Sequence, residues 1–144
     1  SDLQRKVLGD GTRALQAWHT EAQAEAQRCA SMGLTDFAHA ISESIENTRE
    51  AVQIIQSSAS NDGDCVARVA DDFLRGFSFA MLAWAFAASA RAAEQHEDRE
   101  FARHKLQRMR YGVQWLLPQA SVHWARVRGG SSGFVLPPVE YADA

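Results

Sequence analysis

The chain has 144 residues, of which 46% are hydrophobic and 23% are charged, and its formal net charge is −3. This composition argues against an intrinsically disordered chain, and a slightly acidic protein gives no reason to expect nucleic acid as a partner. Alanine occurs 25 times and proline three times, whereas β-branched residues are sparse. These preferences predict an all-α protein.

The first predicted helix covers residues 12–32. Gly9 and Gly11 interrupt its pattern, so residues 2–8 are expected to form a separate turn. Gly33 follows the helix at the position where a left-handed C-terminal cap is typical. Apolar side chains recur along the helix every three or four residues, which marks its buried face: Leu15, Trp18, Ala22, Ala26 and Cys29.

The second and third helices are predicted over residues 35–58 and 64–93, with a polar turn over residues 57–64. The apolar run of residues 77–90 is too short to span a bilayer and indicates a buried helix, so no membrane contact is expected. The inward stripe of the second helix is Phe37, Ile41, Ile45, Thr48, Val52 and Ile55. The inward stripe of the third is Val66, Ala70, Phe73, Phe77, Ala80, Trp84 and Ala87.

A polar connection over residues 94–100 leads to a fourth helix that ends near Arg128, within which Pro118 should cause a kink. Its inward stripe is Ala102, Leu106, Met109, Val113, Leu116, Ala120, Trp124 and Val127. Four long helices with short connections predict an antiparallel up-down four-helix bundle over residues 1–130. Residues 131–144, which follow a glycine-rich stretch, are expected to form an extended C-terminal tail.

The N-terminal sequence SDLQRKVLGDG lacks the apolar core of a signal peptide. Cys29 and Cys65 form neither a disulfide framework nor a zinc-binding spacing, and they fit small buried side chains in a reducing compartment. A cytoplasmic protein is therefore expected.

The last two helices carry apolar side chains on two sides. Helical spacing places Phe79, Leu82 and Phe86 opposite the predicted core stripe of the third helix. On the fourth helix, six side chains lie together away from the core: His104, Arg108, Tyr111, Trp115, Val122 and Arg126. Aromatic residues mixed with arginine are typical of protein interfaces, so the three residues of the third helix and the first four of these six are predicted to contact a partner. The alternative is scattered exposed hydrophobic residues, which are normal on any surface.

Charge is distributed unevenly along the chain. Residues 1–98 contain eight Lys and Arg against 15 Asp and Glu, whereas residues 99–144 contain seven against three. The basic residues that flank the inward stripe of the fourth helix are Arg99, Arg103, Lys105, Arg108 and Arg110. They form either a solvated helix edge or a site for anionic groups.

No motif for catalysis or cofactor binding is present. The chain contains no Glu-x-x-His pair, no G-x-S-x-G, no Walker sequence and no G-x-G-x-x-G. Glu100 and His104 form a single i, i+4 pair, and the adjacent Asp71 and Asp72 point about 100° apart on a helix. No catalytic, metal-binding or cofactor-binding residue is therefore predicted in this chain.

Residues 70–130 resemble the C-terminal helical domain of acyl-CoA dehydrogenases of the acetyl-CoA-dehydrogenase-like type. The resemblance rests on Asp72-Phe73-Leu74-Arg75-Gly76-Phe77, on Met81-Leu82-Ala83-Trp84-Ala85, on Phe101, Lys105-Leu106 and Arg110-Tyr111, and on Leu116-Leu117-Pro118-Gln119-Ala120. Gln107-Arg108-Met109 and Gln119 depart from the family's usual residues.

The resemblance implies a non-catalytic accessory or oligomerisation domain of an FAD-dependent flavoprotein that dehydrogenates an acyl-CoA thioester. It also implies an upstream dehydrogenase core in the same polypeptide, which would hold the FAD and the catalytic glutamate and receive the acyl-CoA substrate. A homodimer is expected as well. The alternative is an autonomous helical-bundle interaction module that dimerises through the third and fourth helices.

Overall fold

The computed structural model describes residues 2–59 and 63–131. The described part contains no strand, and the prediction of an all-α bundle is confirmed. A π-helical turn, η1 (Gly112–Leu116), and a 3₁₀ turn, η2 (Leu117–Gln119), separate the last two α-helices. The α-helices are α1 (Asp2–Ser31), α2 (Thr35–Ala59), α3 (Gly63–Glu94), α4 (Arg99–Tyr111) and α5 (Ala120–Ser131).

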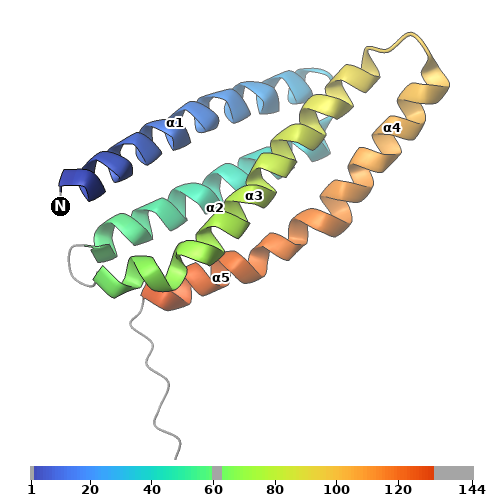
Figure 1. The fold of residues 1–144 in the computed structure, drawn as a ribbon. Coiled ribbons are helices and arrows are strands. Elements are labelled where there is room, and N and C mark those ends of the chain that lie inside the picture. The colour runs from blue at the N-terminus through green and yellow to red at the C-terminus, as the bar shows by residue number, and fades with distance from the viewer. Residues whose placement is uncertain (1, 60–62, 132–144) are drawn as a thin grey trace, which may run out of the picture.

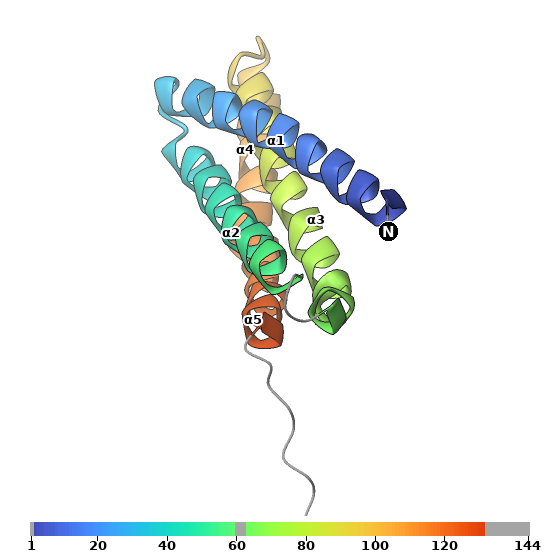
Figure 2. The same cartoon turned by 90° about the vertical axis from the view of Figure 1, so that its left-hand side faces the viewer.

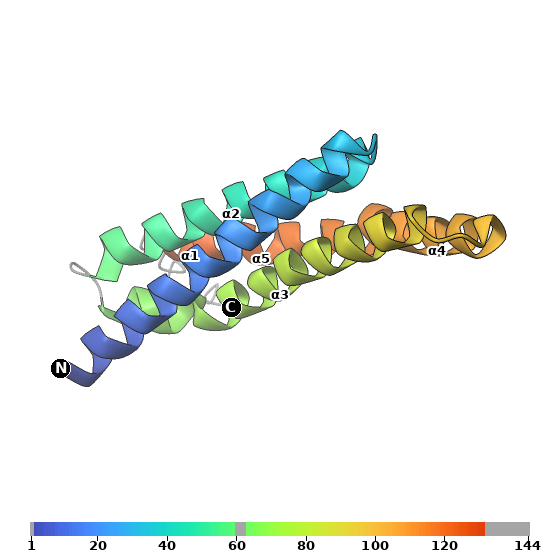
Figure 3. The same ribbon diagram turned by 90° about the horizontal axis from the view of Figure 1, so that it is seen from above.

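The helices form four rods, of which the fourth consists of α4, η1, η2 and α5 joined end to end (Figure 1). The chain reverses direction after α1, after α2 and after α3, so successive rods run in opposite directions. α3 contacts α1, α2, α4 and α5 and is therefore the central helix. α1 and α2 meet at their connection and diverge toward the N-terminus (Figures 2 and 3).

α1 is longer than predicted, because it runs without a break through Gly9 and Gly11. The predicted separate turn over residues 2–8 is wrong, since a glycine inside a helix costs only about 1 kcal/mol relative to alanine. The end of α1 is as predicted. Gly33 has a φ of +77°, and its N–H and that of Leu34 donate to the carbonyls of Ala30 and Cys29. This pair of bonds is a Schellman cap.

The fourth rod begins earlier than predicted, because Asp98 caps it. The Asp98 carboxylate accepts hydrogen bonds from the backbone N–H groups of Glu100 and Phe101, both at 3.1 Å. At Pro118, where a kink was predicted, the structure changes helix type, from the π turn η1 to the 3₁₀ turn η2. Pro118 has no N–H and its ring would collide with the Gln114 carbonyl of a regular α-helix. A π turn precedes it instead, with the Leu117 N–H donating to Gly112.

Two clusters of buried apolar side chains hold the rods together. The larger lies near the α1–α2 and α3–α4 connections and contains Ala22, Ala26, Cys29, Leu34, Phe37, Ile41, Ile45, Ala87, Ala90, Ala93 and Leu106. The smaller lies toward the other end and contains Ala51, Val69, Trp124 and Val127. The inward faces predicted for the first two helices are confirmed at Ala22, Cys29, Phe37, Ile41 and Ile45.

Several predicted segments end differently. α2 ends at Ala59 and α3 begins at Gly63, so most of the predicted turn over residues 57–64 is helical. Residues 60–62 lie outside the described residues. α5 continues through Gly129 and Gly130 to Ser131 and does not end near Arg128. The predicted extended tail lies, beyond Ser131, outside the described residues.

Candidate interaction surface

The outer face of α4, defined by His104, Arg108 and Tyr111 of α4 together with Trp115 of the following turn η1, is exposed to solvent. Tyr111 is 61% exposed and Trp115 is 60% exposed, and their ring centroids lie 6.4 Å apart. His104, Arg108 and Tyr111 also line a shallow hollow, together with Gln107. The side chain of Arg108 forms no ion pair or hydrogen bond with another described residue, so its guanidinium is available to a partner. The four predicted residues of this helix therefore share one continuous surface.

The three predicted residues on α3 divide into two groups. Leu82 is exposed, as an interface residue must be. Phe79 and Phe86 are only partly exposed, because the fourth rod of the same chain packs on that side of α3. The Phe79 ring stacks on His123 at a centroid distance of 6.1 Å. The Phe86 ring lies against Gly112, where an added Cβ would come within 2.6 Å of it.

The predicted core stripe of the third helix is wrong at Trp84. This side chain was predicted to point inward, but it is 37% exposed. Ala70, another residue of the predicted stripe, is also exposed. On the fourth rod, the predicted core residue Leu116 is 39% exposed, because it lies in the π turn η1, which changes the direction in which successive side chains point. The buried line of α3 consists of smaller residues: Val69, Gly76, Ala80, Ala83, Ala87, Ala90 and Ala93. Small side chains let neighbouring helices approach closely, and larger ones are then displaced to the flanks.

Other large apolar residues join Leu82 and Trp84 on the surface of α3. Leu74 is 62% exposed and Met81 is 43% exposed. Gly76 to Ala90 contains no charged residue, so this exposed face also lacks the charges that normally mark a solvated helix. An extended apolar surface of this kind is typical of a contact site.

Two of the basic residues of α4 already have partners within the chain. Arg110 donates to Asp36 of α2 at 3.0 Å and lies 5.8 Å from the centroid of the Phe37 ring. Arg99 donates to the Glu94 side chain at 3.2 Å and to the backbone carbonyls of Glu94 and His96. These two residues hold the rods and the α3–α4 connection in place, so the structure assigns them a stabilising role.

A buried ion cluster between α1 and α3 was missed by sequence reasoning. The Glu25 carboxylate accepts hydrogen bonds from Arg91 Nε at 2.6 Å and from Arg28 Nη2 at 2.8 Å. Burial raises the pKa of Glu25, but the hydrogen bonds from Arg91 and Arg28 outweigh it and hold the pKa below its usual value. The signal was available, because Glu25 falls between Ala22 and Cys29 on the apolar stripe.

The two cysteines offer no reactive thiol in the described part of the chain. Cys29 is fully buried, and burial beside the Glu25 carboxylate raises the pKa of its thiol to about 11. The thiol therefore stays protonated at neutral pH and acts as a small apolar group. The side chain of Cys65 lies outside the described residues.

The adjacent aspartates of α3 have separate partners, as expected for neighbours on a helix. Asp71 accepts from Arg75 at 2.9 Å, whereas Asp72 pairs with His123 of α5 at 2.8 Å. The hydrogen bond to His123, reinforced by Arg126, holds the pKa of Asp72 below its usual value. No group of three or more potential metal ligands occurs among the described residues. Asp72 therefore joins α3 to α5, Asp71 stays within α3, and the two carboxylates do not form a catalytic pair.

One finding bears on the expectation of no membrane contact. The segment Val66–Glu94 is long and apolar enough, by length and composition, to cross a bilayer, with a mean hydropathy of 1.3 over its most apolar window. Length and composition alone are weak grounds for a span. The same helix contacts α1, α2, α4 and α5, which is also the arrangement of a central bundle helix.

The comparisons with known proteins assign the fold to a family. The family described as "Acetyl-CoA dehydrogenase C-terminal like" matches residues 14–135, which cover most of the chain. No curated protein and no solved structure matches the chain. The matched range includes every helix from the second half of α1 onward and extends well beyond the motifs of residues 70–130. The chain therefore belongs to the family of acetyl-CoA-dehydrogenase-like C-terminal domains.

Proposed function

We propose that this chain is the non-catalytic C-terminal accessory domain of an FAD-dependent acyl-CoA dehydrogenase. The family match over residues 14–135 carries the proposal. In the intact protein, an acyl-CoA thioester would lose two hydrogens to FAD, and the flavin would supply that chemistry. The dehydrogenase core of the same polypeptide is the proposed first partner of the domain.

The described residues do not fit a flavin site. A flavin pyrophosphate is normally held by backbone N–H groups at the start of a helix that follows a glycine-rich turn. Gly129 and Gly130 instead lie at the end of α5. FAD therefore belongs to the core in this proposal, and no step of the dehydrogenation is assigned to this chain.

The outer face of α4 is the proposed docking surface. Tyr111 and Trp115 present two large aromatic rings to solvent, one helical turn apart. Each ring buries a large apolar area once it is covered, and Arg108 on the same face is able to pair with a carboxylate of the partner. The exposed Leu82 of α3 extends this surface.

The gene context and flavin binding test the accessory-domain assignment. An open reading frame of flavoprotein size that continues upstream of Ser1 is the expected result, whereas a frame that starts at this position would contradict it. The purified chain is expected to show no flavin absorbance and no dye reduction with acyl-CoAs of several lengths. Stoichiometric flavin or turnover by the chain alone would overturn the assignment.

The docking surface is tested by the double variant Tyr111→Ser with Trp115→Ser. It should keep its helix content by circular dichroism and weaken self-association in sedimentation experiments. The control is Ala17→Ser, which replaces an exposed apolar residue of α1 and leaves the fourth rod unchanged. Unfolding of the double variant without a change in oligomeric state would place this face in the core and contradict the proposal.

The second candidate function is an autonomous module that forms a homodimer through α3 and α4. The exposed apolar side chains Leu74, Met81 and Trp84 of α3 favour it, because they would be covered together by a second copy. A wild-type chain that is monomeric over the micromolar range would remove this candidate and leave the dehydrogenase core as the proposed partner.

A further inference from the structure

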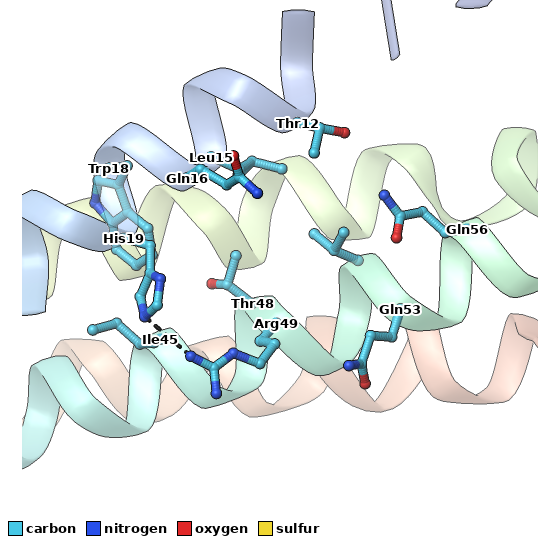
Figure 4. A pocket seen from close by; sticks show the side chains of 11 residues that line it. Thr12, Leu15, Gln16, Trp18, His19, Ile45, Thr48, Arg49, Gln53 and Gln56 are labelled. Carbon is cyan, nitrogen blue, oxygen red and sulfur yellow. Dashed lines mark hydrogen bonds between the residues drawn. The ribbon is translucent and has the colours of Figure 1, made fainter. Parts of the chain in front are cut away.

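A cleft of about 270 Å³ lies between α1 and α2, on the other side of the α2–α3 pair from α4. It opens where the N-terminal half of α1 diverges from α2 (Figures 2 and 3). Its volume is close to the lower limit of ligand-binding pockets. The cleft is lined by Thr12, Leu15, Gln16, Trp18, His19, Ile45, Thr48, Arg49, Val52, Gln53 and Gln56 (Figure 4).

The charge of this lining differs from that of the helices around it. Among the described residues that line the cleft, none is an aspartate or a glutamate, although residues 1–98 contain 15 acidic residues against eight basic ones. Of the same described lining residues, only Arg49 has a permanent charge. The cleft is therefore a locally positive site in the acidic part of the chain.

The polar groups at one end of the cleft are arranged to receive an anion. Arg49 Nη2 lies 3.1 Å from His19 Nε2, and the two side chains come from different helices (Figure 4). Arg49 Nη1 also lies 3.7 Å from a carboxylate oxygen of Glu46. Both side chains are more than half exposed, so this ion pair is weak. Because a guanidinium only donates, Arg49 Nη2 donates to His19 Nε2, and the N–H of the neutral imidazole is on Nδ1. An anionic oxygen would accept from the other N–H groups of the Arg49 guanidinium and from His19 Nδ1–H on the same side chain pair.

The rest of the cleft offers an apolar floor. Leu15 of α1 and Ile45 and Val52 of α2 provide aliphatic surface next to the Arg49–His19 pair, and Trp18 closes one end. Thr12, Gln53 and Gln56 lie at the opposite end (Figure 4). A guanidinium at one end with aliphatic side chains beside it fits a ligand that carries an anionic group on an apolar chain.

We propose that this cleft binds a small carboxylic acid with an apolar chain. Its carboxylate contacts Arg49 and His19, and its chain lies along Leu15, Ile45 and Val52. This site is separate from the docking surface on α4 and does not depend on the function proposed for that surface.

Titration with octanoate tests the proposal, with the indole N–H signal of Trp18 as the reporter. That signal is assigned by its loss in Trp18→Phe. Octanoate is expected to shift it with a saturable dependence on concentration. Acetate lacks six methylene groups of the chain, octanol lacks the charge and octylamine has the opposite charge. Each should bind at least about tenfold more weakly, because either a charged hydrogen-bond pair or most of the apolar contact is lost. Equal binding of octanol or octylamine would overturn the proposal, as would the absence of a saturable shift.

Two variants locate the carboxylate. Arg49→Gln should weaken octanoate binding about tenfold or more, whereas Arg75→Gln, which removes an exposed arginine of α3, should leave it unchanged. Gln53→Glu places a carboxylate one helical turn from Arg49, where it competes with a bound carboxylate for the guanidinium, so it should weaken octanoate binding and strengthen octylamine binding. Octanoate binding that is unaffected by both Arg49→Gln and Gln53→Glu would contradict the proposed site.

Discussion

α3 meets α1 and α5 in two different ways. Against α1, the contact includes a buried ion pair, because the Glu25 side chain is 2% exposed and lies between Arg91 of α3 and Arg28 of its own helix; Trp18 also meets Phe77 edge-on nearby. Against α5, the buried contact is aromatic, because Trp124 is 3% exposed and its indole lies over Gly76 and edge-on to Phe73, whereas the ion pairs of Asp72 with His123 and Arg126 are less buried. The first contact depends on charge balance and the second on shape, so the two should fail for different reasons.

Trp124→Ala should have the largest effect on the aromatic contact. It leaves a cavity between α3 and α5 and should lower the free energy of unfolding by about 3–5 kcal/mol, as other buried aromatic truncations do. Trp84→Ala is the matched control, since Trp84 is on the same bundle but 37% exposed, and should cost less than about 1 kcal/mol. Urea unfolding measures both. Equal losses for the two variants would show that exposure does not separate these tryptophans.

Glu25→Ala should break the ionic contact at a cost of about 3 kcal/mol, the lower end of the range for a buried pair because both arginines keep partial access to water. The loss comes mainly from leaving Arg91 without its carboxylate. Glu21→Ala, one turn earlier on α1 and exposed, should change the free energy of unfolding by no more than about 0.5 kcal/mol. A destabilisation of the same size in Glu21→Ala would attribute the effect to α1 as a whole.

Gly76→Ala tests the shape requirement of the α5 contact with one added carbon. The new Cβ would lie 2.8 Å from three carbons of the Trp124 ring, so the ring must move. Overpacking of about 1–3 kcal/mol, offset by roughly 1 kcal/mol of improved helix propensity, predicts a net loss near 1 kcal/mol. Gly11→Ala has nothing within 4 Å of its Cβ and should be neutral or stabilising. A gain of stability in Gly76→Ala, measured by urea unfolding, would contradict tight packing here.

Acidification should weaken the ion pair of Glu25, with the smallest effect of the four tests. The pKa of Glu25 is lowered in the folded state, so the unfolded state binds the proton more readily. The stabilisation is complete above the ordinary pKa of 4.5 and is lost as the pH falls below it through the folded pKa. Asp72 and Glu50 also have lowered pKa values and act in the same direction. The difference between the wild type and Glu25→Gln in urea unfolding should therefore shrink on acidification below pH 4.5; a constant difference would contradict this assignment.

The sequence alone determined the local structure and the family. Apolar spacing of 3.6 residues located the helices and the buried faces around Ala22, Phe37 and Ile41, because a helix fixes which side chains share a face. Gly33 marked the end of α1, since a left-handed cap favours glycine. The motifs of residues 70–130 indicated the family that the full match over residues 14–135 then confirmed.

Only the tertiary structure decided which large side chains are buried. Trp84 and Trp124 were both predicted to be buried. Trp124 is 3% exposed because its ring packs closely over Gly76, whereas Trp84 is 37% exposed. Phe79 and Phe86 were predicted to contact a partner, and in the structure both rings lie against the fourth rod of the same chain. Glu25 and Arg91 are 66 residues apart in the chain and meet only in the bundle. Periodicity describes one helix at a time, whereas burial depends on which helices approach one another and how closely, and small residues far apart in the sequence set that approach.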